Sequence, residues 1–377
     1  MRIIFFGGTG AIGRRVVNEI CKFPKVRRVI IASRKMKSYQ KLLKEVESGN
    51  SGKGNKLSYL NLDLRRCFNL PEILRSNDVV VGAMGPFYKY EEVLAKASVK
   101  ARVHYVSICD DHDVVKRVLG LNEAAKKKGV CILTGMGWTP GLSSLLARSG
   151  ADLLDGVDSI RIYWAGNSSN SMGIAVILHV LHSFTGKVPA VRDGKTSFVR
   201  AGSGKERIDF LNPLGKITVY NIGHPEPVTI PCHFPGIKEV TLKGGVNENL
   251  LNRIAILAGR SGLSRSYIIR DALALFFQKT LPFWRKIARP MPEVSGITVV
   301  VEGDFHGKQC SLTYKAVGPM EVLTGIPMAF AIKGLVSGDI KERGVLSPEA
   351  PGMINPSEVF KELESKGVQI EMEKDLL

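Results

Sequence analysis

The sequence lacks the long apolar runs and the cysteine patterns that mark several classes of protein. No apolar run reaches the ~20 residues that a helix needs to cross a bilayer, and the N-terminal residues enter an apolar stretch directly, without a secretory signal. The six cysteines are dispersed, with no C-x-x-C pair and no zinc-site spacing to the histidines. We therefore expect a soluble cytoplasmic protein with reduced thiols and no metal.

Acidic residues are scarce, with 35 aspartates and glutamates against 53 lysines and arginines, which gives a formal net charge of +18 at pH 7. Such an excess suits nucleic acid, an anionic membrane face, or phosphorylated and carboxylated small molecules. The basic residues are spread along the chain, and no zinc finger or RNA-binding motif accompanies them. The sequence therefore favours a small-molecule partner over nucleic acid.

With 377 residues, the chain exceeds the usual size of one domain, so we expect two. Over residues 1–139, short apolar runs alternate with amphipathic stretches, which predicts an α/β fold: a Rossmann domain with a six-stranded, doubly wound parallel sheet. Over residues 140–318, strands follow one another with helices interspersed, which predicts a second, α+β domain with a mixed or antiparallel sheet.

The expected elements can be given by residue range. In the first domain, strands are expected at 2–6, 27–32, 57–62, 78–82, 103–108 and 130–133, and helices at 11–22, 38–47, 70–76, 90–99 and 113–128. In the second, strands are expected at 158–165, 196–200, 216–220, 236–243, 296–305 and 308–317, the last two forming a hairpin that turns at His306-Gly307. Helices are expected at 321–336 and 356–366.

A glycine-rich motif of the form G-x-G-x-x-G follows the first expected strand and opens the first expected helix; its residues are Gly8, Thr9, Gly10, Ala11, Ile12 and Gly13. In this context Gly8 permits a tight turn, Gly10 lets the backbone approach a pyrophosphate, and Gly13 allows the helix to pack on the strand. The N–H groups at the start of the helix then face the phosphates. The motif predicts dinucleotide binding.

The end of the second expected strand indicates which dinucleotide is bound. A site selective for NAD places a carboxylate there for the ribose 2′-hydroxyl, but this sequence reads Ala32-Ser33-Arg34-Lys35. Arg34 can form paired hydrogen bonds with a 2′-phosphate, and Ser33 can donate another. The sequence therefore favours NADP(H) over NAD(H), although cations at this place can also be merely solvated.

Two further strand ends belong to the expected cofactor site. Asp63 follows the third strand, where such folds contact the adenine, and it is equally suited to capping the next turn. The fourth strand ends in Gly82-Ala83-Met84-Gly85-Pro86-Phe87, whose small residues let a ribose lie against the backbone. From this segment we expect contacts from Ala83, Met84, Gly85 and Phe87.

Several stretches, in order along most of the chain, resemble the saccharopine dehydrogenase (saccharopine reductase) family, which includes carboxynorspermidine dehydrogenase. They read GGTGAIG, VVGAMGPFYKYEEVLAKA, HYVSICDD, ILTGMGWTPGLSSLLA, VTIPCHFPGIKEVTLKGG and VLTGIPMAFAIKGLVSGDIKERGVLSPE. The resemblance implies a Rossmann domain completed by C-terminal segments at about 319–377, and a second domain that binds substrate and often forms a homodimer interface. It also implies NADP(H)-linked reduction of an imine to a secondary amine, or the reverse, in amino-acid metabolism such as lysine biosynthesis.

The resemblance also implies roles for particular residues. Trp138, Pro140 and Gly141 would line the cleft near the nicotinamide, and the cofactor contacts would come from Gly10, Ala11, Ile12, Ser33, Arg34, Asp63, Ala83, Gly85 and Phe87. One position departs from the family: where many members read HYVD, this chain has His104-Tyr105-Val106-Ser107, with acids only at Asp110 and Asp111. The role of the missing carboxylate does not carry over to Ser107.

Hydride transfer to an iminium needs positioning, exclusion of water and a group that holds or removes a proton, because the cofactor carries the chemistry. Asp110 is the candidate catalytic residue, while Asp111 is better suited to capping the helix near Asp113. In the second domain, Arg200 and Lys243 are candidates to bind substrate carboxylates, although a surface role is the commoner one.

Residues 271–287 form an apolar, aromatic and basic stretch, DALALFFQKTLPFWRKI. A core or domain-interface helix is the simpler interpretation, and a helix lying on a membrane surface is the alternative.

The leading hypothesis is thus a saccharopine-dehydrogenase-like, NADP(H)-dependent oxidoreductase that acts on a C–N bond of an amino acid or polyamine derivative. One alternative is a reductase of a carbonyl or lipid-like compound. The other is a protein that binds NADP(H) as a sensor or scaffold without turnover.

Overall fold

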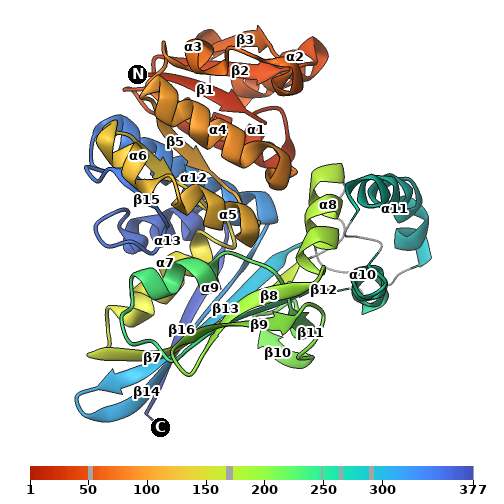
Figure 1. The fold of residues 1–377 in the computed structure, drawn as a ribbon, viewed down its shortest axis with the longest axis vertical. Coiled ribbons are helices and arrows are strands. Elements are labelled where there is room, and N and C mark those ends of the chain that lie inside the picture. The colour runs from red at the N-terminus through yellow and green to blue at the C-terminus, as the bar shows by residue number, and fades with distance from the viewer. Residues whose placement is uncertain (50–53, 167–172, 248, 263–265, 288–292, 377) are drawn as a thin grey trace. The chain divides into compact units, whose positions relative to one another are not determined.

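The computed structural model describes residues 1–49, 54–166, 173–247, 249–262, 266–287 and 293–376. Within it the chain divides into two compact units (Figure 1). Unit 1 comprises Met1–Leu142 and Glu321–Val359, and unit 2 comprises Ser143–Met320 and Phe360–Leu377.

Unit 1 is built on a parallel sheet with the strand order β15-β6-β5-β4-β1-β2-β3. The strands are β1 (Arg2–Phe6), β2 (Arg28–Ser33), β3 (Leu57–Asn61), β4 (Val79–Gly82), β5 (His104–Ser107), β6 (Cys131–Leu133) and β15 (Gly344–Leu346). The six strands expected from the sequence are confirmed. β4 is wholly buried and β1 nearly so, as expected of parallel strands covered on both faces.

Unit 1 contains the helices α1 (Ala11–Ile20), α2 (Met36–Gly49), α3 (Leu70–Leu74), α4 (Phe87–Ala101), α5 (His112–Leu119), α6 (Asn122–Lys127) and α12 (Met320–Ser337). Helix α13 (Pro356–Ser365) begins in unit 1, and its residues from Phe360 on belong to unit 2. The single helix expected over 113–128 is wrong: it ends at the C-cap residue Gly120, and α6 begins after Leu121. Helix α12 is long and apolar enough to cross a membrane by length and composition, and 67% of it is buried inside the protein.

The strand order of unit 1 reverses between β1 and β4, because β1 is followed by β2 on one side while β4 lies on the other. In open α/β sheets, ligands bind outside the carboxyl ends of the strands at such a reversal. The turns that follow β1, β2 and β4 therefore define the place where a cofactor is to be sought.

Unit 2 contains a nine-stranded mixed sheet with the order β10-β11-β12-β7-β13-β14-β16, to which β8 and β9 are joined through β12. The strands are β7 (Gly156–Gly166), β8 (Lys187–Arg192), β9 (Lys195–Arg200), β10 (Glu206–Phe210), β11 (Gly215–Asn221), β12 (Glu239–Val246), β13 (Ser295–Phe305), β14 (Lys308–Gly318) and β16 (Gln369–Leu376). β7 and β12 run parallel and the other pairs antiparallel. The expected mixed sheet is confirmed, as is the hairpin at His306-Gly307.

Three strands of unit 2 were not expected from the sequence. β8 contains Pro189, which cannot donate a hydrogen bond and argues against a strand. β10 and β16 are short or strongly charged, as edge strands often are. The resemblance in the sequence assigns residues from about 319 to 377 to the Rossmann domain. For the part from Phe360 on this assignment is wrong, because strand β16 pairs with β14 in the second sheet.

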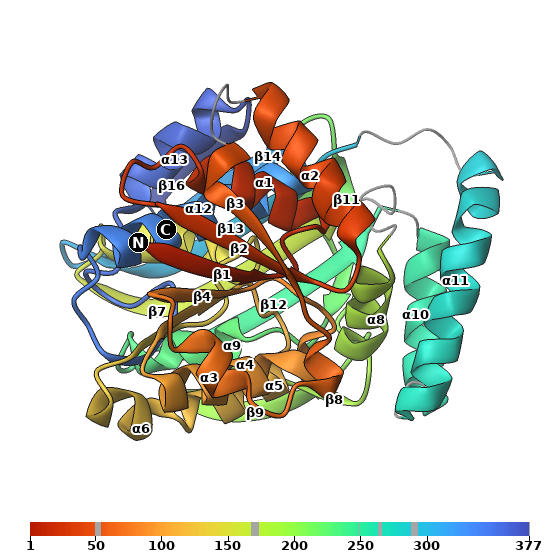
Figure 2. The ribbon, with the colours of Figure 1, turned by 90° about the horizontal axis from the view of Figure 1, so that it is seen from above.

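The helices of unit 2 are α7 (Leu142–Ala151), α8 (Ile174–Ser183), α9 (Glu226–Thr229), α10 (Asn249–Arg260) and α11 (Tyr267–Ile287). Both α10 and α11 pack against α8. Figure 2 shows these three helices side by side at the right-hand edge. Their contact has a small core of its own, in which Leu178 and Leu181 of α8 meet Ala274 of α11.

Candidate cofactor and catalytic site

The turn between β1 and α1 has a geometry that only glycine permits at two positions. Gly7 has a φ of +88°, which L side chains rarely adopt, and the backbone N–H of Gly10 donates to the Gly7 carbonyl oxygen over 3.0 Å. A Cβ on Gly13 would lie 2.2 Å from the Gly7 carbonyl oxygen and 2.7 Å from the Gly8 Cα. The helix can therefore approach the strand this closely only because residue 13 has no side chain.

The start of α1 is open to a ligand. Gly10 is the N-cap, no side chain caps the helix, and both Gly10 and Ala11 are exposed. A Cβ on Gly10 would meet only the Gly7 carbonyl oxygen, at 3.3 Å. Because the first N–H groups of a helix have no acceptor within the helix, those of α1 are suited to receive phosphate oxygens. The residues present thus fit the pyrophosphate of a dinucleotide.

The segment after β4 lies against the same turn. The N–H of Ala83 donates to the Phe6 carbonyl oxygen over 2.8 Å, and a Cβ on Gly7 would lie 2.2 Å from the Ala83 carbonyl oxygen. Met84 and Gly85 follow, both half-buried, and the buried Phe87 begins α4. The structure therefore brings the glycine motif and the Ala83–Phe87 segment together at the strand-order reversal.

The end of β2 carries the residues expected to select the dinucleotide. Ser33 is the last residue of β2, and its hydroxyl accepts from the N–H of Lys35 over 3.3 Å. Arg34 follows and is exposed. No acidic residue occupies positions 33–37, so the segment itself carries only positive charge.

Asp63 caps the turn that follows β3. Its carboxylate accepts from the backbone N–H of Arg65 over 3.1 Å and forms an ion pair with the Arg65 guanidinium over 2.6 Å. The hydrogen bond from Arg65 is the main cause that lowers the pKa of Asp63, to about 2, and Arg34 also contributes. Of the two roles that the sequence left open, the cap is the one observed, and the residue stays ionised at neutral pH.

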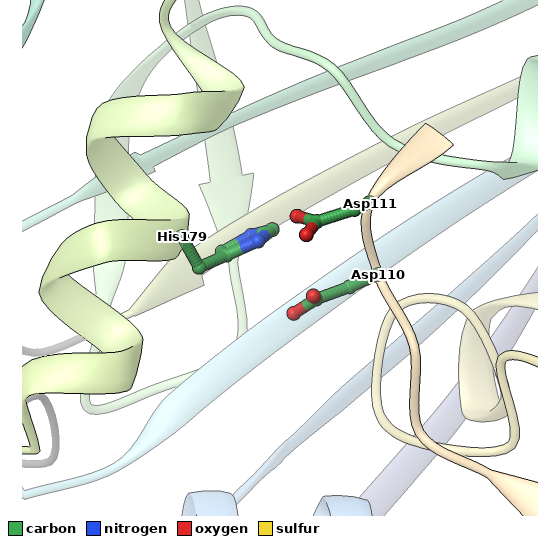
Figure 3. A group of neighbouring side chains, drawn as sticks. All are labelled: Asp110, Asp111 and His179. Carbon is green, nitrogen blue, oxygen red and sulfur yellow. The ribbon is translucent and has the colours of Figure 1, made fainter. Parts of the chain in front are cut away.

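Asp110 and Asp111 lie on the segment that follows β5, and Figure 3 shows both side chains extending from it. Their carboxylate oxygens lie within 4.8 Å of one another. Asp110 is half-buried, whereas Asp111 is 1% exposed. Asp111 occupies the N-cap position of α5, but its carboxylate accepts from the N–H of Tyr88, at the start of α4, over 2.9 Å. The expectation that its side chain caps its own helix is therefore wrong.

Glu91 forms a buried hub beneath the carboxyl ends of β5 and β6. Its carboxylate accepts hydrogen bonds from the hydroxyls of Tyr105 (2.6 Å), Ser107 (2.5 Å) and Thr134 (3.1 Å). Burial raises the pKa of Glu91 to about 7, against the effect of these three donors, and the charge of Asp111 raises it further. The hub connects α4, β5 and the segment after β6 through a single carboxyl group.

The burial of Glu91 could have been predicted from its position on a helix, although a charged residue is usually expected at the surface. The residue lies on the buried stripe of α4 with Phe87, Leu94, Ala95 and Ser98, at the spacing of one helix face. A glutamate on an apolar stripe predicts a satisfied buried carboxyl. Ser107 supplies one of its donors.

The three residues expected near the nicotinamide lie in a tight, buried loop after β6. The N–H of Gly137 donates to the Pro140 carbonyl oxygen over 2.9 Å, and that of Leu142 to the Gly137 carbonyl oxygen over 2.9 Å. Gly141 has a φ of +122°, and Trp138 is 9% exposed. The loop is thus held by its own backbone.

The two cations expected to bind substrate lie in unit 2. Lys243 on β12 forms an ion pair with Glu206 over 2.6 Å and lines a cavity of about 690 Å³ on the sheet, together with Arg161 and Tyr163. Arg200, at the end of β9, is exposed. A substrate carboxylate would have to share Lys243 with Glu206.

A second buried polar group, in unit 2, was not predicted from the sequence. The hydroxyl of Ser143 donates to Glu226 over 2.7 Å, the other carboxylate oxygen of Glu226 lies 3.8 Å from Nδ1 of His224, and Nε2 of His224 lies 3.3 Å from Nε2 of His179. His179 extends from α8, as Figure 3 shows. Because Ser143 and His179 are far in sequence from the pair His224 and Glu226, no local pattern brings the four together.

Comparison with known proteins bears on this geometry. Residues 3–133 match the family described as "Saccharopine dehydrogenase NADP binding domain". The match covers about a third of the chain, its N-terminal part. The matched range contains the glycine motif, Arg34, the β4 segment and Glu91, so unit 1 carries a nicotinamide-dinucleotide-binding domain, as the resemblance in the sequence implied.

The whole chain shares its fold with a solved saccharopine dehydrogenase (L-Glu forming) from Saccharomyces cerevisiae, with a TM-score of 0.67, 16% identity, and coverage of 99% of both chains. An amine dehydrogenase from Mycobacterium smegmatis aligns with a TM-score of 0.47 and 11% identity, over 94% of this chain and 95% of the other. A "Lipid droplet localized protein" of Caenorhabditis elegans is 23% identical over 139 residues, which span 36% of this chain and 33% of that protein. The match thus covers about a third of the curated relative's length.

Proposed function

We propose that the protein is an NADP(H)-dependent oxidoreductase that reduces an imine formed from an amine and a carbonyl compound, or oxidises the secondary amine in reverse. Its substrate class is amino-acid or polyamine derivatives. The observation that carries the cofactor assignment is Arg34, an exposed guanidinium that follows β2 where an NAD-selective site would place a carboxylate. A 2′-phosphate complements that charge, whereas a free 2′-hydroxyl gains little from it.

Arg34→Ala tests this assignment. Loss of charge-assisted hydrogen bonds of about 2 kcal/mol should weaken NADPH binding roughly 30-fold and leave NADH binding within about threefold of wild type. Both affinities are measured by the fluorescence of the reduced nicotinamide. Lys41→Ala, which removes an exposed cation from α2, is the control for a general change of charge. Equal losses for the two cofactors would show that Arg34 does not contact the 2′-phosphate.

The chemistry asks little of the protein beyond placement and proton handling. The bound dinucleotide supplies or accepts the hydride, and reduction of a C=N bond also requires one proton on nitrogen. The half-buried Asp110 is the residue that we assign to hold this proton or to orient the substrate amine. The hub at Glu91 holds the ends of β5 and β6, from which the Asp110 segment and the Trp138 loop continue. Trp138, Pro140 and Gly141 would exclude water there.

Asp110→Asn is expected to lower kcat about tenfold, less than the roughly 100-fold or more usual for general acid–base catalysis, because the substrate amine can carry its own proton. The affinity for NADPH should not change. The assay follows NADPH consumption at 340 nm with amines paired with keto acids or semialdehydes, and mass spectrometry identifies the secondary amine. A variant with wild-type kcat would remove Asp110 from the mechanism.

A second candidate is an NADP(H)-dependent reductase of a carbonyl or lipid-like compound. The lipid-droplet localisation in the name of the C. elegans relative supports it. Apolar aldehydes and ketones without amine separate the two: consumption of NADPH with these alone favours the second candidate. NADPH binding without turnover on either panel favours a sensor or scaffold.

We also propose that the protein works in the cytoplasm as a homodimer. The dispersed cysteines suit a reducing compartment, and the resemblance to saccharopine dehydrogenase supports the dimer. Analytical ultracentrifugation of the full chain measures the oligomeric state directly.

A further inference from the structure

Helix α11 has two apolar faces, and its packing in unit 2 uses one of them. Ala274, with Leu273 and Phe277, packs against α8 in the small helical core. On another face, Ile268 is 82% exposed, Leu275 48% and Phe276 57%. These three residues stand at positions i, i+7 and i+8 and thus form one stripe along the helix.

Between and beyond these three residues, the same face of α11 carries a small residue and a cation. Ala272 and Lys279, at i+4 and i+11 from Ile268, lie on the same face and are exposed. Single exposed apolar residues are normal in soluble proteins, but a stripe of large ones along a helix indicates an interaction surface.

Helix α10, which also packs on α8, presents a second face of the same character. Leu257 is 64% exposed, and Arg253 and Arg260, at i−4 and i+3 from it, are exposed. Leu257 thus stands between two cations, and on α11 Phe276 stands one turn before the cation Lys279. The expectation of a core or domain-interface helix for residues 271–287 therefore holds, over the described side chains 271–280, for one face of α11.

The charge of this region is mainly positive. From residue 249 to residue 287 the sequence contains seven lysines and arginines and a single acid, Asp271; Arg270 is buried, whereas Arg253, Arg260 and Lys279 are exposed. Such a combination of large apolar residues and cations is typical of helices that lie in the interface of a membrane, with the apolar face inserted and the cations near anionic headgroups.

We propose that the exposed faces of α10 and α11 bind an anionic phospholipid surface. Ile268, Leu275, Phe276 and Leu257 enter the acyl boundary, and Arg253 and Lys279 pair with headgroups. A second copy of the chain is a poorer occupant, because an isologous contact would set two faces of the same positive charge against each other. The proposal is independent of the enzymatic activity.

Flotation of the full-length protein with vesicles tests it. On phosphatidylcholine vesicles containing about a third phosphatidylserine, the wild type should float, and added salt should weaken binding because it screens the charges. The double variant Ile268→Ser/Phe276→Ser should bind at least about tenfold more weakly, since two large apolar side chains no longer enter the acyl boundary. Phe198→Ser is the matched control: Phe198 on β9 is 58% exposed, so it should bind like the wild type.

A charge variant separates the two contributions. In Arg253→Glu/Lys279→Glu, the ratio of the affinity for phosphatidylserine-containing vesicles to that for phosphatidylcholine vesicles should fall about tenfold. The weak binding to phosphatidylcholine alone should not change. The melting temperature and the NADPH affinity of each variant should match those of the wild type. The NADPH titration reports on unit 1, so a failed cofactor assignment and a failed membrane proposal remain distinguishable.

Three results would overturn the proposal. The first is absence of wild-type flotation on phosphatidylserine vesicles at low salt, and the second is equal flotation of the wild type and Ile268→Ser/Phe276→Ser. The third is a wild-type dimer, seen in ultracentrifugation, that the same double variant dissociates; this would assign the face to a second copy of the chain.

Discussion

Gly13→Ala is expected to lower the affinity for NADPH by at least about 100-fold. The added Cβ would lie 2.2 Å from the Gly7 carbonyl oxygen and 2.7 Å from the Gly8 Cα, and real Cβ atoms do not approach backbone so closely. The start of α1 must then move away from the turn by roughly an ångström, and misplacement on that scale costs about two orders of magnitude where groups must be positioned. The N–H groups that face the pyrophosphate move with it.

The same change should also cost about 1–3 kcal/mol in the free energy of unfolding, as overpacking does. Gly49→Ala is the matched control, because Gly49 ends α2 in the same unit and a Cβ there meets nothing within 4 Å. Isothermal titration and urea denaturation measure the two effects. If Gly13→Ala bound NADPH like Gly49→Ala, the turn after β1 would not hold the cofactor.

Glu91 should make the stability of the protein fall as the pH rises from about 5 to about 8. Its folded pKa is raised to about 7 from an ordinary 4.5. Between these values the folded state keeps a proton that the unfolded state has lost, so stability is fully present below the lower value and is lost on the way to the upper one. A shift of this size corresponds to about 3 kcal/mol.

Glu91→Gln removes this dependence, because an amide does not ionise and the hydroxyls of Tyr105, Ser107 and Thr134 can rotate to suit it. Relative to the wild type, the variant should gain about 3 kcal/mol in the free energy of unfolding at about pH 8 compared with about pH 5. Glu92→Gln is the control on the adjacent residue: hydrogen bonds from Lys96 and Arg117 lower the pKa of Glu92, so it stays ionised over this range. Parallel pH profiles for the wild type and Glu91→Gln would contradict the buried, proton-sharing hub.

The parts of the fold that could be predicted are those determined by patterns within short stretches of the sequence. The strand, glycine turn and helix from residue 2 to residue 20 follow from apolar runs and from glycines at fixed spacing, and the hairpin at His306-Gly307 follows from two alternating strands around a short turn. β15 adds to a sheet formed mainly by residues more than 200 positions earlier. β8 could not be predicted because Pro189 argues against a strand. The sequence does not show that this strand pairs mainly on one side, with β9, where a proline can be tolerated.

The candidate site divides in the same way. Arg34 and the glycines occupy positions that the βα pattern defines, so their places were predictable. Glu91 needed the three-dimensional structure, because its donors come from residues 105, 107 and 134. Asp111 illustrates the limit of cap patterns: its position at the start of α5 was predicted, whereas its hydrogen bond to the N–H of Tyr88 depends on how α4 and α5 pack.

Titration of the full-length protein with NADPH and, in parallel, with NADH tests the central claim most directly. The account predicts saturable binding of NADPH, with enhanced nicotinamide fluorescence and a raised melting temperature, and binding of NADH weaker by at least about tenfold. Failure of both coenzymes to bind, or equal affinity for the two, would contradict it.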